Sequence, residues 1–156
     1  MLFQLFPEFI LSMFAILYLF TKNKTYSLLL SGSILNIYTG LFLKYLFKLS
    51  IPFLGNDFVL RPSDAFACNF FNNVSNKGDV GMPSNHSMLA GYLFYHFFQQ
   101  KHRHLAWLFL LVPLSRLRNN QFPIINHGDF ACHTWFQIIF GFIFGLLFGH
   151  LLHFIP

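Results

Sequence analysis

The sequence predicts an all-α, polytopic transmembrane helical bundle with about five spanning helices. Hydrophobic residues make up 55% of the 156 residues and charged residues only 10%, and the mean hydropathy is +0.53. A water-soluble domain carries more charge than this. The apolar runs are close to the ~20 residues that cross a bilayer, and short polar segments separate them. We therefore expect one integral-membrane domain over residues 1–156.

The first two apolar runs cover about residues 6–20 and 26–47, with the polar segment Thr21-Lys22-Asn23-Lys24 between them. The first run lacks a basic region before it and a convincing small-residue cleavage site, so we expect a membrane helix rather than a cleaved signal. The second contains small and polar residues, which are tolerated where helices pack closely. Residues 50–83 are rich in Pro, Gly and Asn, and predict a long loop with a functional role.

The third run follows the turn Gly81-Met82-Pro83-Ser84-Asn85-His86-Ser87. Pro, Ser and Asn are typical of helix starts, which predicts a helix from Ser84 to about Gln99. The free N–H groups of a first helical turn, together with the positive end of the helix dipole, suit a bound phosphate. We expect the chemistry of the protein at this turn.

The last two runs cover about residues 104–117 and 133–154, with a polar loop between them. The fourth run is short and contains Pro113. The fifth carries Gly141, Gly145 and Gly149 at four-residue spacing, which predicts close helix packing and not a ligand site.

Five spans place the loops on two sides of the membrane. The basic turns at Lys22–Lys24 and Lys101–Arg103 share one side, and the loops before His86 and His133 share the other. The positive-inside rule predicts that the basic turns are cytoplasmic and that the other loops face the lumen or exterior. Disulfides persist on that side, so Cys68 and Cys132 are either bridged or two free thiols.

Several cations and histidines meet on the predicted lumenal side. A single one of these side chains is usually an interfacial anchor or a hydrogen-bonded structural residue. Together they predict a pocket for an anion beside a nucleophile and a proton donor. Nucleic acid is not an expected partner, because the ten basic residues are spread over loops and helix ends. The group comprises Lys44 or Lys48, Arg61, Ser84, His86, Arg116, Arg118, His127 and His133.

Three short motifs in this order resemble those of the type 2 phosphatidic acid phosphatase superfamily, Lys…Arg-Pro, Pro-Ser-Gly-His and Ser-Arg…His…Asp. Here they read Arg61-Pro62, Pro83-Ser84-Asn85-His86, and Ser115-Arg116 followed by His133. Within the superfamily, Gly81-Met82-Pro83-Ser84 and His133-Thr134-Trp135-Phe136-Gln137 are most similar to the dolichyl diphosphatase branch. The matched region runs from about residue 44 to 137, which implies a motif-bearing core over about residues 44–156.

The resemblance implies hydrolysis of a polyprenyl, dolichyl-type diphosphate to the monophosphate. His133 would attack phosphorus and form a phosphohistidine, while His86 would protonate the leaving group and then activate water. No metal or other cofactor is expected, because fixed cations can stabilise phosphoryl transfer and no cluster of acids is evident. The implied phosphate-binding residues are Arg61, Arg116, Ser84, Asn85, and Lys44 or Lys48.

The first two motifs depart from the superfamily pattern. Asn85 stands where the superfamily has Gly, and Asn tolerates unusual backbone angles better than most residues. Leu54 occupies the position, seven residues before Arg61, where the superfamily has Lys. The motif lysine is therefore either Lys44 or Lys48.

The third motif also departs from the pattern. The long gap between Arg116 and His133 leaves His127 as an alternative nucleophile. Gln137 favours His133, because it lies four residues further on and its amide oxygen can accept the imidazole N–H. Gln137 replaces the usual Asp, and Asp129 is a further candidate for the missing carboxylate.

Other functions fit parts of this pattern. A phosphatidate or undecaprenyl diphosphate phosphatase would use the same residues, and a decayed site would leave a protein that only binds an anionic lipid. A haem or metal protein is less well supported, since His96, His150 and His153 form no obvious ligand set. The expected location is the endoplasmic reticulum membrane with a lumenal site, or the bacterial inner membrane with a periplasmic site.

Overall fold

The structure is a computed structural model, and it describes residues 6–61, 79–100, 103–115 and 132–154. These residues are helical apart from connecting turns and isolated bridge residues, among them an antiparallel pair formed by Leu60 and Val80. The all-α prediction is thus confirmed. The elements are α1 (Phe6–Thr21), α2 (Lys24–Leu49), α3 (Ile51–Leu54), α4 (Asn56–Val59), α5 (Asn85–Gln99), α6 (Arg103–Ala106), the 3-10 helix η1 (Trp107–Leu110), α7 (Leu111–Leu114) and α8 (Trp135–His153).

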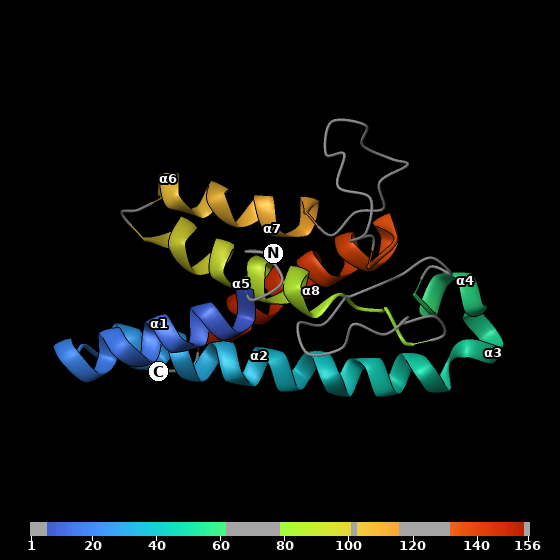
Figure 1. The fold of residues 1–156 in the computed structure, drawn as a ribbon, viewed down its shortest axis with the longest axis horizontal. Helices are drawn as coiled ribbons and strands as arrows, with labels where there is room; N and C mark the ends of the chain where they lie inside the picture. The colour runs from blue at the N-terminus through green and yellow to red at the C-terminus, as the bar shows by residue number, and fades with distance from the viewer. Residues whose placement is uncertain (1–5, 62–78, 101–102, 116–131, 155–156) are drawn as a thin grey trace.

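The helices α1 and α2 form an antiparallel pair (Figure 1). α2 begins after Asn23, whose side chain accepts a hydrogen bond of 2.9 Å from the backbone N–H of Thr25. α1 buries Phe6, Ile10 and Phe14, which its four-residue spacing places on one face. α2 runs past the first residues of α1 to α3 and α4, which turn the chain back toward the bundle (Figure 1).

The helix α5 lies at the centre of the bundle. All residues from Ser87 to Leu93 are buried, and the helix packs against α8, α2 and the α6–η1–α7 segment. Leu89, Ala90, Tyr92 and Leu93 form one apolar cluster with α1 side chains. Because the phosphate-binding turn predicted from the sequence begins α5, the core of the bundle fixes the position of that turn.

Glycines bring the backbones of α5 and α8 into contact. A Cβ atom on Gly141 would lie 2.6 Å from the carbonyl oxygen of Ser84, and a Cβ atom on Gly145 would lie 2.8 Å from the carbonyl carbon of Met88. Gly91 of α5 approaches the α8 backbone in the same way. The glycine spacing therefore serves close packing, as its sequence pattern predicted.

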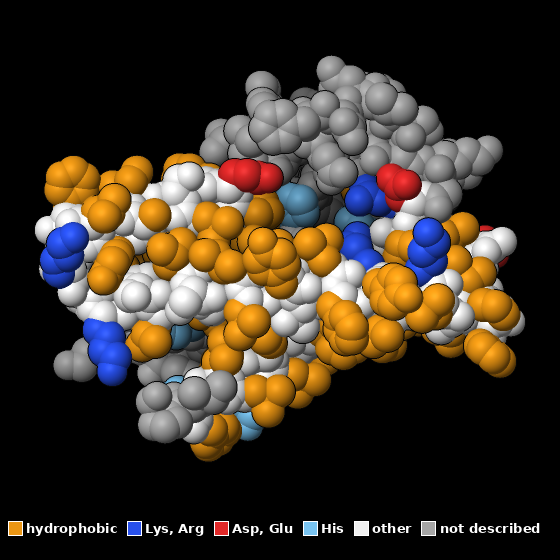
Figure 2. All heavy atoms as spheres, turned by 90° about the horizontal axis from the view of Figure 1, so that it is seen from below, with side chains coloured by type: hydrophobic (Ala, Val, Ile, Leu, Met, Phe, Trp, Pro, Cys, Tyr) orange, Lys and Arg blue, Asp and Glu red, His pale blue; other side chains and the backbone are white. Residues whose placement is uncertain are grey.

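The described surface carries many large apolar side chains, and the buried face of α2 includes polar residues. Phe20 is 86% exposed and Phe53 is 90% exposed, whereas Ser33 and Asn36 of α2 are completely buried. Figure 2 shows hydrophobic side chains over most of one face, with Lys and Arg toward its two ends. In the described chain, α2 and α8 are long and apolar enough to cross a membrane, and α1 and Arg103–Leu114 are apolar but shorter.

Two segments differ from the sequence expectation. Part of the loop predicted over residues 50–83 is helical, because α3 and α4 lie within it. The fourth apolar run is broken into α6, η1 and α7 rather than forming one regular helix. Pro113 contributes to the break, since it has no N–H to donate to the carbonyl four residues earlier.

Candidate functional site

Two short segments form a paired arm beside the bundle, residues 59–61 and 79–82. Leu60 and Val80 form an antiparallel bridge, and the N–H of Arg61 donates to the Asp79 carbonyl at 2.8 Å. The N–H of Gly81 donates to the Val59 carbonyl at 2.9 Å. The arm therefore joins Arg61, the arginine of the first motif, to the segment that leads into α5.

The arm brings two cations together. The Nζ of Lys44 donates to the Val80 carbonyl at 3.0 Å, and Lys44 lies within electrostatic range of Arg61. The Nε and Nη1 atoms of Arg61 are buried and have no hydrogen-bond partner in the described part of the chain. Burial lowers the pKa of Arg61, while the nearby Asp79 carboxylate opposes this shift. Two like charges with unused donors are suited to a shared anion.

Lys48, the other candidate for the motif lysine, is exposed. It lies one helical turn beyond Lys44 on α2, and no bond to the arm is found for it among the residues described. The structure thus brings Lys44, and not Lys48, to Arg61.

The start of α5 follows the predicted pattern. Ser84 is the N-cap, and its hydroxyl oxygen accepts a 3.1 Å hydrogen bond from the Ser87 hydroxyl and a long 3.5 Å one from the Ser87 N–H. Ser84 is fully buried, so its side chain first serves to cap the helix. Asn85 and His86 occupy the first turn and are half-buried.

Asn85 packs closely against α2. A Cβ atom on Gly40 would lie 2.5 Å from the Asn85 Oδ1 atom, so the small residue at position 40 makes room for the amide. This Oδ1 atom is buried and finds no partner within the described ranges. This oxygen can only accept a hydrogen bond, and it faces α2 at Gly40.

His133 and Gln137 are joined as the sequence predicted. His133 is 3% exposed, and its Nδ1 lies 3.2 Å from the Oε1 of Gln137. The helix α8 begins at Trp135, later than predicted, with Thr134 and Gln137 forming a capping box. His133 therefore precedes the helix, and the contact comes from the cap rather than from a shared helical face.

The hydrogen bonds of Gln137 determine its orientation. Its Nε2 donates to the carbonyl oxygens of Leu60, at 2.6 Å, and Phe58, at 3.3 Å. Carbonyls only accept, so the amide nitrogen must face them and Oε1 must face His133. It follows that Nδ1 of His133 carries a hydrogen and donates it to Gln137 Oε1.

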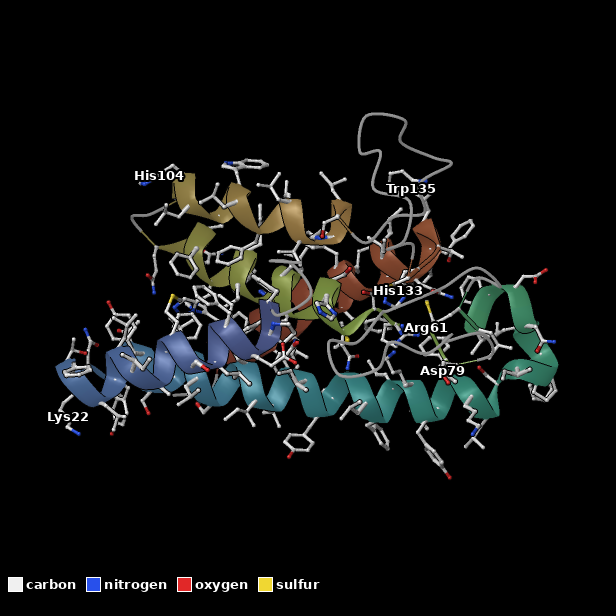
Figure 3. The ribbon with its side chains drawn as sticks, viewed as in Figure 1. Lys22, Arg61, Asp79, His104, His133 and Trp135 are labelled. Atoms are coloured by element: carbon white, nitrogen blue, oxygen red, sulfur yellow. The ribbon has the colours of Figure 1, made fainter. Side chains whose placement is uncertain are left out.

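Gln137 also connects the two helix starts. Its backbone oxygen accepts a 3.1 Å hydrogen bond from the N–H of Ser84. The site is therefore assembled from α2, the arm, the start of α5 and the start of α8. Figure 3 shows His133, Arg61 and Asp79 in the half of the molecule nearer α3 and α4, and Lys22 and His104 toward the opposite end.

Several predicted site residues lie outside the described ranges. Arg116, Arg118, His127 and Asp129 are among them, so the choice between His127 and His133 stays a prediction. Cys132 is buried and disulfide-bonded, and Cys68, the only other cysteine of the chain, is also outside these ranges.

Some residues of the site carry little sequence signal. The sequence distinguishes Gly81 only as part of a motif, but a Cβ atom there would lie 2.7 Å from the Cδ atom of Gln137. Gly40 and the carbonyls of Phe58 and Leu60 could not be found from the sequence, because main-chain acceptors and remote packing partners leave no residue-type pattern.

Within the described residues, no group of three or more His, Cys, Asp or Glu side chains is arranged to hold a metal ion. Comparisons with protein-family models, curated proteins and solved structures found no match to this chain. The functional argument therefore depends on the geometry of the site and on the motifs of the sequence.

Proposed function

We propose that this chain is a membrane-embedded, metal-independent lipid phosphatase of the type 2 phosphatidic acid phosphatase superfamily. Its substrate is a polyprenyl, dolichyl-type diphosphate, which it hydrolyses to the monophosphate. The observation that carries the proposal is the pairing of Lys44 with Arg61, two neighbouring cations with buried donors, beside a histidine whose Nδ1 is held by Gln137. This arrangement supports an anion site with an oriented nucleophile.

In the first step, the electron pair on Nε2 of His133 attacks the terminal phosphorus atom. A P–N bond forms, the bond from phosphorus to the bridging oxygen breaks, and His86 gives its proton to the departing lipid monophosphate. In the second step, His86 takes a proton from water, the water oxygen bonds to phosphorus, and the P–N bond breaks to release phosphate. Lys44, Arg61 and Arg116 stabilise the charge on the phosphoryl oxygens.

The membrane placement is part of the same proposal. Two helices of sufficient length, together with the exposed apolar side chains, support membrane association. We propose five spans, with α1, α2, α5, the Arg103–Leu114 segment and α8 crossing, and with the site on the lumenal or periplasmic side. The basic residues Lys22 and Arg103 then face the cytoplasm, and Figure 3 shows Lys22 and His104 away from His133.

The decisive test is phosphate release by the purified protein in detergent, with a polyprenyl diphosphate as substrate and EDTA present. We expect activity that chelation does not remove, and a labelled phosphohistidine that can be trapped from a substrate labelled in its terminal phosphate. His133→Ala should abolish both. His153→Ala, which alters an exposed histidine at the other end of α8, is the matched control.

The same assay separates the alternatives. Faster turnover of phosphatidate or undecaprenyl diphosphate would change the assigned substrate but not the chemistry. Binding of lipid phosphates without any turnover or trapped intermediate would favour an anionic-lipid-binding protein with a decayed site. Full activity of His133→Ala, or loss of activity with EDTA, would exclude the proposed mechanism.

A further inference from the structure

The side chain of Gln137 makes more hydrogen bonds than are needed to orient His133. It is fully buried, and its Oε1 accepts from the Thr134 N–H at 3.3 Å as well as facing His133. Its Nε2 donates to the carbonyls of Phe58 and Leu60, the residues that lead into Arg61. One side chain therefore contacts both the nucleophile and the arm that carries the phosphate-binding arginine.

The two sides of this contact need opposite hydrogen-bonding groups. His133 and Thr134 present N–H groups, which need an acceptor, whereas Phe58 and Leu60 present carbonyl oxygens, which need a donor. A carboxylate only accepts, so it would remove the donor from these two part-buried carbonyls and would be repelled by them. An amide satisfies both sides. This explains why Gln, and not an acid, stands at position 137.

Gly81 supports the same arrangement. A Cβ atom at this position would lie 2.7 Å from Cδ and 2.8 Å from Nε2 of Gln137. Those distances are far inside ordinary contact, so the turn before α5 must be a glycine for the amide to reach the arm. The amide is thus enclosed between the arm and the start of α8.

We propose that Gln137 is a positioning residue for Arg61 as well as for His133, and that its amide sets the distance between phosphate-binding arginine and nucleophile. The proposal rests on the proposed function, because it assumes that Arg61 binds a phosphoryl group. Loss of the two donor bonds frees the Leu60 carbonyl and lets the adjacent guanidinium leave its place. Anion affinity then falls although Arg61, Lys44 and His133 are all still present.

The test measures the affinity of the full chain in detergent for inorganic phosphate by calorimetry. The variants are Gln137→Glu, Gln137→Met and Gly81→Ala, and the wild type is measured alongside at each pH. A protonated carboxyl group has one donor and one acceptor, so Gln137→Glu can imitate the amide in acid. Burial against two carbonyls raises the pKa of the introduced group above the ordinary value of about 4.3, which brings its protonation into a measurable range.

At about pH 7.5 we expect each variant to bind phosphate roughly tenfold more weakly than the wild type, the effect of about one lost buried hydrogen bond. At about pH 5.5 we expect only Gln137→Glu to return to within about threefold of the wild type, because only its side chain regains a donor. If Gln137→Glu folds only at the lower pH, the phosphate affinities of Gln137→Glu and Gln137→Met at that pH still test the inference.

Two results would overturn the inference while leaving the anion site intact. One is wild-type phosphate affinity for Gln137→Glu at the higher pH, and the other is equal weakness of Gln137→Glu and Gln137→Met at both pH values. A wild-type protein that binds no phosphate at either pH would overturn the inference together with the proposed function. Phosphate binding by the wild type therefore distinguishes the two failures.

Discussion

Substitution of Gly145 by alanine should separate the two helices that carry the site. The new Cβ atom would lie 2.8 Å from the carbonyl carbon of Met88, and the oxygen of that carbonyl would be closer still. Ordinary contact begins at 3.4 Å, so α5 and α8 must move apart by at least 3.4 − 2.8 = 0.6 Å. The same shift at the helix starts would lengthen the 3.1 Å bond from Ser84 to Gln137 to 3.1 + 0.6 = 3.7 Å, beyond hydrogen-bonding distance.

Two effects follow from this displacement. Overpacking of this kind costs about 1–3 kcal/mol of unfolding free energy, or roughly 3–10 °C in Tm for a chain of this size. A misplacement approaching 1 Å between catalytic groups lowers the rate by up to about 100-fold. Thermal unfolding in detergent and hydrolysis of the proposed diphosphate substrate measure the two effects separately.

Gly149→Ala is the matched control, since it adds the same atom to the same helix. Its Cβ atom would meet only the side chain of Tyr95, at 3.0 to 3.2 Å, and a side chain can rotate away. We expect a smaller loss of stability and little loss of rate. The reasoning is wrong if Gly145→Ala keeps the wild-type Tm and activity, or if Gly149→Ala is equally damaging.

Three further predictions concern the cations and the cysteines. Lys44→Met should lower kcat/KM about 100-fold, because it removes a cationic hydrogen-bond donor to the phosphoryl oxygens. Lys48→Met changes an exposed lysine and should stay within about twofold of the wild type. Equal effects of the two substitutions would contradict the choice of Lys44. Arg61→Lys should weaken phosphate binding by roughly tenfold, because an ammonium group lacks the guanidinium fork, and calorimetry measures the change. Because Cys132 is disulfide-bonded, a reducing agent should lower the unfolding free energy of the wild type by about 2–4 kcal/mol. The same treatment should not change the unfolding free energy of Cys68→Ser. A wild type whose stability does not respond to the reducing agent would argue against the bridge.

Much of the helical fold could be predicted because the position and length of an apolar run determine where a helix can lie and how long it can be. The predicted runs at residues 6–20 and 26–47 correspond to α1 and α2, and the run from Ser84 to Gln99 corresponds to α5. The glycine spacing in α8 predicted packing correctly, since only a small residue lets two backbones approach. These features depend on residue type and spacing, which a sequence displays directly.

The arm and its contacts could not be predicted in the same way. Leu60 and Val80 pair through main-chain groups that every residue has, so the pairing leaves no trace in composition. The choice of Lys44 over Lys48 depends on which lysine reaches the Val80 carbonyl, and that carbonyl is placed by the arm. The contact between His133 and Gln137 was predicted from four-residue spacing, but the helix cap, and not a helical face, produces it.

The pairing of Leu60 with Val80 also bears on how far the length of the segment between them can change. The bridge closes the base of the segment between them, so both ends of that segment are fixed by the arm itself. The entropic cost of closing a loop grows slowly with its length, by only about 0.6 kcal/mol for each doubling. Residues can therefore be inserted or deleted there during evolution while Arg61 keeps its place beside Lys44.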